Sequence, residues 1–193
     1  LANRLVHLSH SCDLDPFKSN GSQKIDAKNE KRRQNILDEV SETGIDLYGP
    51  FKNLRKFYNC RADQKGATDD LKDAINASTA ADPLWIIEAG EPDLIGYALR
   101  AAKKEARQHV HVVSHHPAND NSGDFFTWKQ ILNFGVKEHQ IGDQNVKLKT
   151  APSVWNWAKN HDDSRIQLLW TIGKLAEVDN VVKFQKGKWD CSD

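Results

Sequence analysis

The chain has 193 residues, of which 38% are hydrophobic and 28% charged, and its 27 basic and 27 acidic side chains give a formal net charge of zero. No stretch approaches the roughly 18 uninterrupted apolar residues that a membrane-spanning helix needs, and no basic excess indicates nucleic-acid or membrane binding. We therefore expect one α/β domain over residues 1–193. The chain lacks methionine, so we also expect a missing first strand or a processed N-terminus.

Short β-rich segments alternate with longer segments of helical periodicity along the whole chain. A continuous apolar run at 84–87 predicts a strand buried on both faces of a parallel sheet. Apolar residues recur at helical spacing behind a first-turn proline at 92, which predicts a helix to residue 107. The expected strands are 4–9, 56–60, 84–88, 109–114 and 137–141, and the expected helices are 25–42, 69–78, 92–107, 152–159 and 164–177.

This alternation predicts an open, mostly parallel, doubly wound sheet with helices on both faces, because parallel strands need crossover connections. Ligands of such folds bind beyond the carboxyl ends of the strands. The loops that follow the expected strands are therefore the candidate site.

The first of these loops contains His10, Asp13, Asp15 and Asn20. The two aspartates have a spacing that lets both reach one oxygen-liking cation, although aspartates in turns also cap backbone amides. After the third strand, a glycine turn with Glu91 leads into a helix N-terminus that offers free amide donors. We predict substrate contacts from His10, Asp13, Asn20 and Glu91, with Asp13 and Asp15 as metal candidates.

Histidines and amides follow the fourth strand, where His115 and His116 precede Asn119. Adjacent residues of an extended chain point in opposite directions, so we expect only one of the two histidines to face the cleft. After the fifth strand, Asp143 precedes Asn145 in a turn that could orient sugar hydroxyls or supply acid–base chemistry. We predict His116 and Asp143 as catalytic, and Asn119 and Asn145 as substrate-binding; turn formation and backbone capping are the alternatives.

The three cysteines, Cys12, Cys60 and Cys191, lack the close pairing of a zinc site. They allow one disulfide bond at most. A bridge between Cys12 and Cys60 and three free thiols are both open, and we favour a secreted or periplasmic location over a cytoplasmic one.

The succession PLWIIEAGEPDLIGYAL at 83–99, the strand within 109–116 and the loop Asp143-Gln144-Asn145 together resemble nucleoside hydrolases, and in particular the nucleoside-hydrolase-like bacterial branch tied to carbohydrate metabolism. The resemblance covers about residues 4 to 175. It implies hydrolysis of a glycosidic bond, with calcium held by aspartates at the end of the first strand. That N-terminal aspartate motif is not present in this chain.

We therefore predict a hydrolase that acts on a glycosidic bond of a nucleoside or carbohydrate, with calcium as the possible cofactor. The alternative is a carbohydrate-binding or accessory protein that keeps the fold without the chemistry. Trp128, Trp155 and Trp157 are its candidate sugar platforms, although we favour core packing for each. The zero net charge favours a neutral sugar or nucleoside over a nucleic acid or a membrane as the partner. A receiver-type regulatory domain ranks last, because no fitting acidic pocket follows the first expected strand.

Overall fold

The structure is a computed structural model. It describes residues 4–10, 12, 14, 31, 34–39, 42, 45–46, 51–115, 117–142, 149–150, 153, 156–164, 166–167, 170, 183–185 and 188–190. Contacts within the chain divide it into two compact units, Leu1–Ile141 and Gly142–Asp193. The expectation of one domain stays a prediction, and each unit is described by itself.

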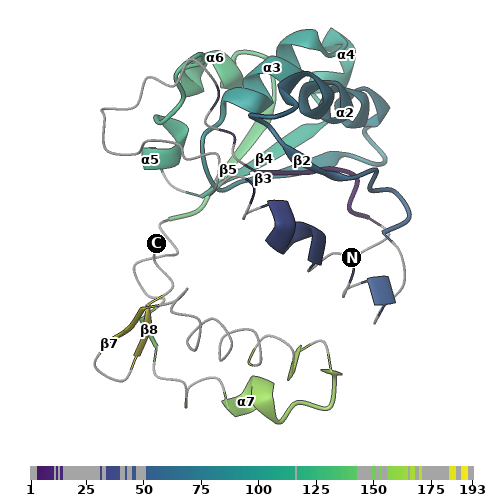
Figure 1. The fold of residues 1–193 in the computed structure, drawn as a ribbon. Helices are drawn as coiled ribbons and strands as arrows, with labels where there is room; N and C mark the ends of the chain where they lie inside the picture. The colour runs from purple at the N-terminus through teal and green to yellow at the C-terminus, as the bar shows by residue number, and fades with distance from the viewer. Residues whose placement is uncertain are drawn as a thin grey trace. The chain divides into compact units, whose positions relative to one another are not determined.

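The first unit contains two parallel sheets (Figure 1). Strand β1 (Leu8–His10) pairs with β2 (Phe57–Asn59). Strand β3 (Leu84–Glu88) pairs with β4 (Val110–Ser114), which pairs in turn with β5 (Lys137–Gln140). The parallel α/β arrangement expected from the sequence is confirmed, and all five expected strands lie within a residue or two of their predicted positions, apart from the late start of β1.

Helix α2 (Gln64–Ala77) packs against α3 (Asp93–Ala101) over the sheets. It begins earlier than the periodicity predicted, because the Asp63 carboxylate accepts a hydrogen bond from the Gly66 N–H and caps the first turn. Three apolar side chains on one face of α2 are buried and fix its orientation. They are Ala67, Leu71 and Ile75.

The expected helix at 92–107 is divided into α3 and the short α4 (Lys104–Arg107). The backbone is extended at Ala102 (ψ 160°) and at Lys103 (ψ 134°). The Arg107 guanidinium donates to the carbonyls of Arg100 and Ala102 at 3.2 and 2.7 Å, so the carbonyls at the end of α3 find partners outside the helix. The apolar periodicity of the sequence does not reveal this break, because the buried Ala106 of α4 continues the same helical spacing beyond it.

Helices α2, α3, α4 and α6 (Trp128–Leu132) lie on one side of β3, β4 and β5 in Figure 1. On the helix side, Val110 and Val112 are fully buried. On the other side, Trp85 is 53% exposed and Ile87 is 79% exposed. The prediction that the run at 84–87 is buried on both faces is therefore wrong for these two residues, because an apolar run does not say which face has a covering layer. Helices on both faces of the sheet stay a prediction.

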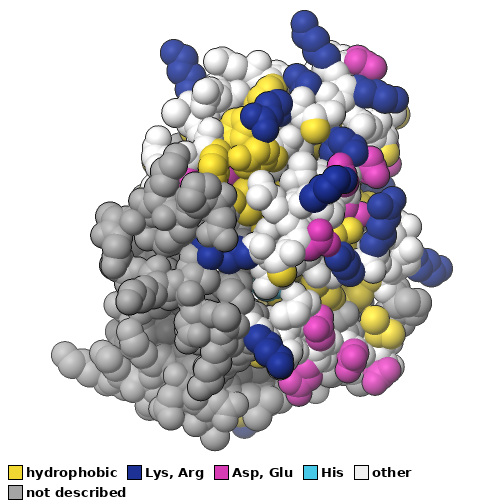
Figure 2. All heavy atoms as spheres, turned by 45° about the horizontal axis from the view of Figure 1, so that its top comes forward, with side chains coloured by type: hydrophobic (Ala, Val, Ile, Leu, Met, Phe, Trp, Pro, Cys, Tyr) yellow, Lys and Arg dark blue, Asp and Glu magenta, His cyan; other side chains and the backbone are white. Residues whose placement is uncertain are grey.

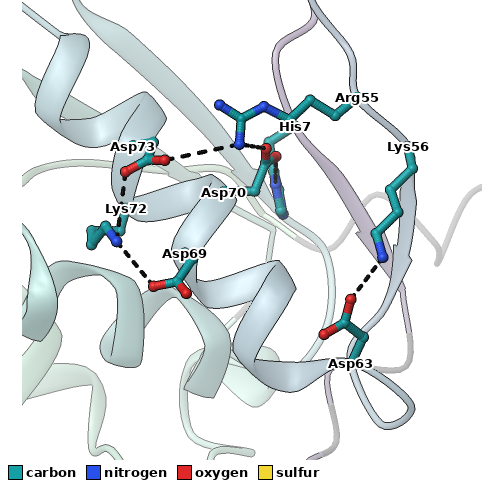
Figure 3. A network of polar contacts seen from close by, with 8 residues as sticks. All are labelled: His7, Arg55, Lys56, Asp63, Asp69, Asp70, Lys72 and Asp73. Carbon is teal, nitrogen blue, oxygen red and sulfur yellow. Dashed lines mark hydrogen bonds and ion pairs between the residues drawn. The ribbon is translucent and has the colours of Figure 1, made fainter.

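A network of polar contacts ties the segments before β1 and before β2 to α2 (Figure 3). Asp70 of α2 lies between His7 and Arg55, with Nδ1 of His7 at 2.8 Å and Nη1 of Arg55 at 3.4 Å. Burial lowers the pKa of His7, although the Asp70 carboxylate acts in the opposite direction. At the other end of α2, Lys56 pairs with Asp63 at 2.7 Å. The surface over the helices mixes acidic and basic side chains (Figure 2), in keeping with the balanced composition.

The second unit contains a small antiparallel sheet in the order β6-β8-β7 and helix α7. None of the three strands was predicted. The predicted helices at 152–159 and 164–177 are described only in part, with helical residues at 156–159, 164, 166–167 and 170. The predicted helix at 25–42 of the first unit is also described in part, with helical residues at 31, 34–39 and 42. No helix among the described residues is long and apolar enough to cross a membrane. The strands and α7 have the bounds Lys149–Thr150 (β6), Lys183–Gln185 (β7), Lys188–Asp190 (β8) and Asn156–Lys159 (α7).

Candidate functional site

Polar side chains come together at the carboxyl ends of β3, β4 and β5. The sheet register places Glu88 beside Ser114, and Ser114 beside Gln140, so that the last residues of the three strands form a row. Residues paired across strands point to the same face of a sheet. Glu88 and Ser114 are 3% and 0% exposed, which places this part of the row on the helix-covered side.

Glu88 is the chemically unusual member of the row. Its Oε1 accepts a hydrogen bond from the Gly90 N–H at 3.1 Å. Its Oε2 is buried and has no hydrogen-bond partner among the described residues. Burial, with a smaller contribution from the negative charge of Asp120, raises the pKa of Glu88 to about 7, against the opposing effects of the Gly90 N–H and, more weakly, the His115 N–H. A carboxyl group with this pKa exchanges a proton near neutral pH.

The second carboxylate of the site, Asp120, comes from a different element. It ends the short helix α5 (Pro117–Asp120), which follows β4, and it is 2% exposed. The Gln140 amide at the end of β5 donates to Oδ2 of Asp120. The proline-led turn after β4 thus returns a carboxylate to the strand ends, where its charge acts on Glu88.

The loop that follows α5 is held in place by a third buried carboxylate. Asp93, at the start of α3, accepts the backbone N–H groups of Asp124, Phe125 and Phe126 at 2.7, 3.0 and 2.9 Å. Gly123 approaches this carboxylate so closely that a Cβ there would lie 2.9 Å from Oδ1. This clamp anchors the chain immediately after the α5 segment that carries Asp120.

A cavity of about 1220 Å³ opens beside this row. Glu88 and Glu91 line it at the carboxyl end of β3, and His10 and Cys12 line it at the carboxyl end of β1. Oε1 of Gln34 lies 2.9 Å from Nε2 of His10. The cavity therefore connects the first and third loops that the sequence identified as ligand-binding.

The structure describes three of the predicted site residues. His10 and Glu91 line the same cavity, as a shared substrate site requires. Asn119 lies apart from that lining, on α5, with Nδ2 at 3.2 Å from Nδ1 of His115. The other predicted residues lie outside the described residues and stay predictions: Asp13, Asp15, Asn20, His116, Asp143 and Asn145.

Sequence reasoning missed Glu88, Ser114, Asp120 and Gln140. Glu88 was counted as the end of an apolar strand, and Asp120 as part of a polar loop. One signal could have identified Glu88, namely a carboxylate that directly follows a buried apolar run at a strand end. Nothing in the sequence pairs it with Asp120, because the two meet only through the folded sheet.

Calcium, which the resemblance implies, does not fit the described part of the site. Among the described residues no group of three or more metal-ligating side chains is found. Calcium takes six to eight oxygen ligands, whereas a carboxyl group with a pKa of about 7 is partly protonated at neutral pH. Glu88 is therefore better suited to proton transfer than to holding the ion.

The cysteines and tryptophans named from the sequence occupy defined positions. The Sγ atoms of Cys12 and Cys60 lie 3.5 Å apart, and both are free thiols; Cys191 lies outside the described residues. Trp128 is 9% exposed and donates its indole N–H to Glu138, so of the two roles considered for it the structure shows core packing and not an exposed sugar platform. Trp157 of α7 is 55% exposed, and Trp155 lies outside the described residues.

Comparison with known proteins finds a relative in Formosa agariphila that carries the name "Uncharacterized protein P22". The two are 53% identical over 193 residues, which cover 100% of this chain and 69% of the relative. This chain belongs to the family of that protein. No protein-family model matches the chain, and no solved structure matches it.

Proposed function

We propose that the protein hydrolyses a glycosidic bond of a nucleoside or neutral carbohydrate at the carboxyl ends of β3 and β4, with Glu88 as general acid. The observation that carries this proposal is the buried Glu88 carboxyl group, whose pKa is raised to about 7 beside a second carboxylate. Glycosidases use such a pair: one carboxyl group stays protonated to assist the leaving group, while another group activates water or attacks the sugar.

Glu88 supplies the proton because it is kept protonated by burial and because it borders the cavity. Asp120 acts through Glu88 as a positioning residue, since its charge disfavours ionisation of Glu88. The Gly90 N–H holds Oε1, which leaves Oε2 as the proton-donating atom. His116 and Asp143, which come next in the chain after β4 and β5, are our candidates for activating water.

The resemblance to nucleoside hydrolases and the neutral overall charge support the same class of substrate. A cavity wall that joins His10, Glu88 and Glu91 offers several polar groups to sugar hydroxyls. Calcium remains a proposal that rests on Asp13 and Asp15.

The test is a panel of ribosides and aryl glycosides, assayed from pH 5 to pH 9 with and without added calcium. We expect turnover that declines above about pH 7, as Glu88 loses its proton. Glu88→Gln should lower kcat by about 100-fold or more, since general acids contribute roughly 10²- to 10⁴-fold. The matched control is Glu105→Gln, an exposed glutamate on α4. Turnover that survives in Glu88→Gln, or no turnover of any substrate, would contradict the proposal.

A non-catalytic carbohydrate-binding function is the second candidate, and the exposed indole of Trp157 favours it. Exposed aromatic rings stack on sugar rings. Calorimetry with oligosaccharides separates the two candidates, because binding without turnover that is lost in Trp157→Ala supports the second. Trp128→Phe serves as the buried control.

A further inference from the structure

We propose that the cavity between β1 and β3 receives one further parallel β-strand, supplied by the part of the family's longer chain outside these 193 residues. That strand joins the two sheets of the first unit into one, in the order β2-β1-strand-β3-β4-β5. This inference rests on the geometry of the cavity and not on the proposed function: the strand would lie between residues 5–9 and 84–87, and the carboxyl end of the cavity, with His10, Glu88 and Glu91, would stay open to a ligand.

The first argument is that each of the two strands has one edge paired and its other edge toward the cavity. β1 pairs with β2 and β3 pairs with β4, and among the described residues no backbone hydrogen bond joins β1 to β3. Residues 4–10 line one wall without a gap, and residues 82–91 line the other. A wall formed by consecutive residues presents backbone N–H and C=O groups along an unpaired strand edge, to which a further strand can hydrogen-bond.

The second argument is that the two walls run in the same direction. Nη2 of Arg4 lies 2.9 Å from Oδ1 of Asp82, which joins the amino end of one wall to the amino end of the other. At the opposite end the lining reaches Cys12 and Glu91, beyond the carboxyl ends of β1 and β3. A strand parallel to both walls therefore meets two parallel edges, as in every other pairing of this unit.

The third argument comes from the helices above the cavity. Leu71 and Ala74 of α2 line it together with Leu94 and Ile95 of α3. These side chains are apolar, so a strand in this place would bury apolar side chains toward the helices, as β4 does with Val110 and Val112. The volume of about 1220 Å³ also exceeds the roughly 300–1,000 Å³ typical of a small-molecule site.

The family itself offers the source of the strand. The Formosa agariphila relative matches the whole of this chain at 53% identity, yet the match covers only 69% of the relative. The remaining chain of that protein is long enough to supply a strand of ordinary length. A strand from the same polypeptide also avoids the entropic cost of recruiting a separate partner.

Hydrogen exchange read by mass spectrometry tests the proposal on this chain and on the longer Formosa agariphila protein. We expect the segments that match residues 5–9 and 84–87 to exchange at least about tenfold more slowly in the longer protein, because their inner edges gain partners. The matched control is β5, the outer edge of the same sheet, which should exchange alike in both proteins.

Three results would overturn the proposal. Equal exchange of the two walls in both proteins would mean that no strand fills the cavity. Slow exchange in this chain alone, together with a dimer mass by light scattering, would mean that a second copy fills it. Slow exchange only after a riboside is added would mean that the cavity is a ligand site.

Discussion

Glu88 and Asp93 lie close together in the chain, and both carboxyl groups are buried, yet their surroundings differ. Asp93 is 0% exposed and accepts three backbone N–H groups from the loop after α5. Glu88 is 3% exposed, accepts one N–H on one oxygen and has no hydrogen-bond partner on the other among the described residues. The two carboxyl groups are buried to a similar degree, so the number of N–H groups that donate to each distinguishes their surroundings.

The comparison separates a carboxylate that holds structure from one suited to chemistry. Three N–H groups replace the water that the Asp93 carboxylate has lost and tie it to the loop. The N–H groups near Glu88 do not outweigh its burial, so its pKa is raised. The Asp93 clamp anchors the loop after Asp120, and the Asp120 charge raises the pKa of Glu88 further. Four substitutions test this difference, in order of decreasing expected effect.

Asp93→Ala should give the largest loss of stability. It leaves three backbone N–H groups without their acceptor, at roughly 1–3 kcal/mol for each buried unsatisfied group, so we expect the free energy of unfolding to fall by at least about 3 kcal/mol. Urea denaturation measures it. The control is Asp82→Ala, which removes an exposed ion pair with Arg4 and should cost less than about 1 kcal/mol. Equal losses in the two variants would refute the clamp.

Glu88→Gln should remove a decline in the free energy of unfolding that the parent protein shows between about pH 4.5 and pH 7. The pKa of Glu88 is raised from 4.5 to about 7, so the folded state binds the proton more tightly than the unfolded chain. Its contribution to stability is complete below about pH 4.5 and is lost as the pH rises to about 7, a decline of at most about 3 kcal/mol. Glutamine does not titrate, so this decline should be absent in the variant. Urea denaturation at several pH values tests it, with Glu105→Gln expected to keep the decline.

Gly123→Ala should disturb the clamp without removing it. A Cβ at this position would lie 2.6 Å from the Phe126 carbonyl oxygen and 2.9 Å from Oδ1 of Asp93. We expect a loss of about 1–3 kcal/mol, as for other overpacked sites. The control is Gly90→Ala, where nothing lies within 4 Å and the N–H to Glu88 is kept. Its unfolding free energy should stay within about 0.5 kcal/mol of the parent protein.

Asp120→Asn should have the smallest effect. It removes a like charge near Glu88 and keeps an oxygen that can accept from Gln140. The pKa of Glu88 should fall by less than about one unit, because burial is the larger cause and remains. Carbon-13 NMR titration of the Glu88 carboxyl group measures the shift, with Asp82→Asn as the exposed control. An unchanged or higher pKa would show that Asp120 does not act on Glu88.

The strands were the most predictable part of the fold, and helix boundaries were less so. The strand expected at 84–88 matches β3 to the residue, because four consecutive apolar residues at 84–87 between turn signals leave few alternatives. Helix α2 was placed late, because the Asp63 cap and not the apolar stripe sets its start. The predicted burial of Trp85 and Ile87 was wrong, since it depends on what covers the face of β3 that points away from the helices.

The candidate site was predictable in its location and less so in its members. The rule that ligands bind beyond the carboxyl ends of parallel strands led to His10 and Glu91, and both line one cavity. Glu88 was missed because its raised pKa comes from burial and from Asp120, neither of which local sequence shows.

The sequence by itself determined the parallel α/β architecture, the positions of its first five strands along the chain and the edge where polar side chains gather. These features follow from local periodicity and turn residues, which a chain carries wherever it folds. Only the tertiary structure decided that Asp93 meets three amides while Glu88 keeps an oxygen with no partner among the described residues, and that β1 and β3 stand apart with a cavity between them. Such features depend on residues far apart in the chain, so only the folded backbone brings them into contact.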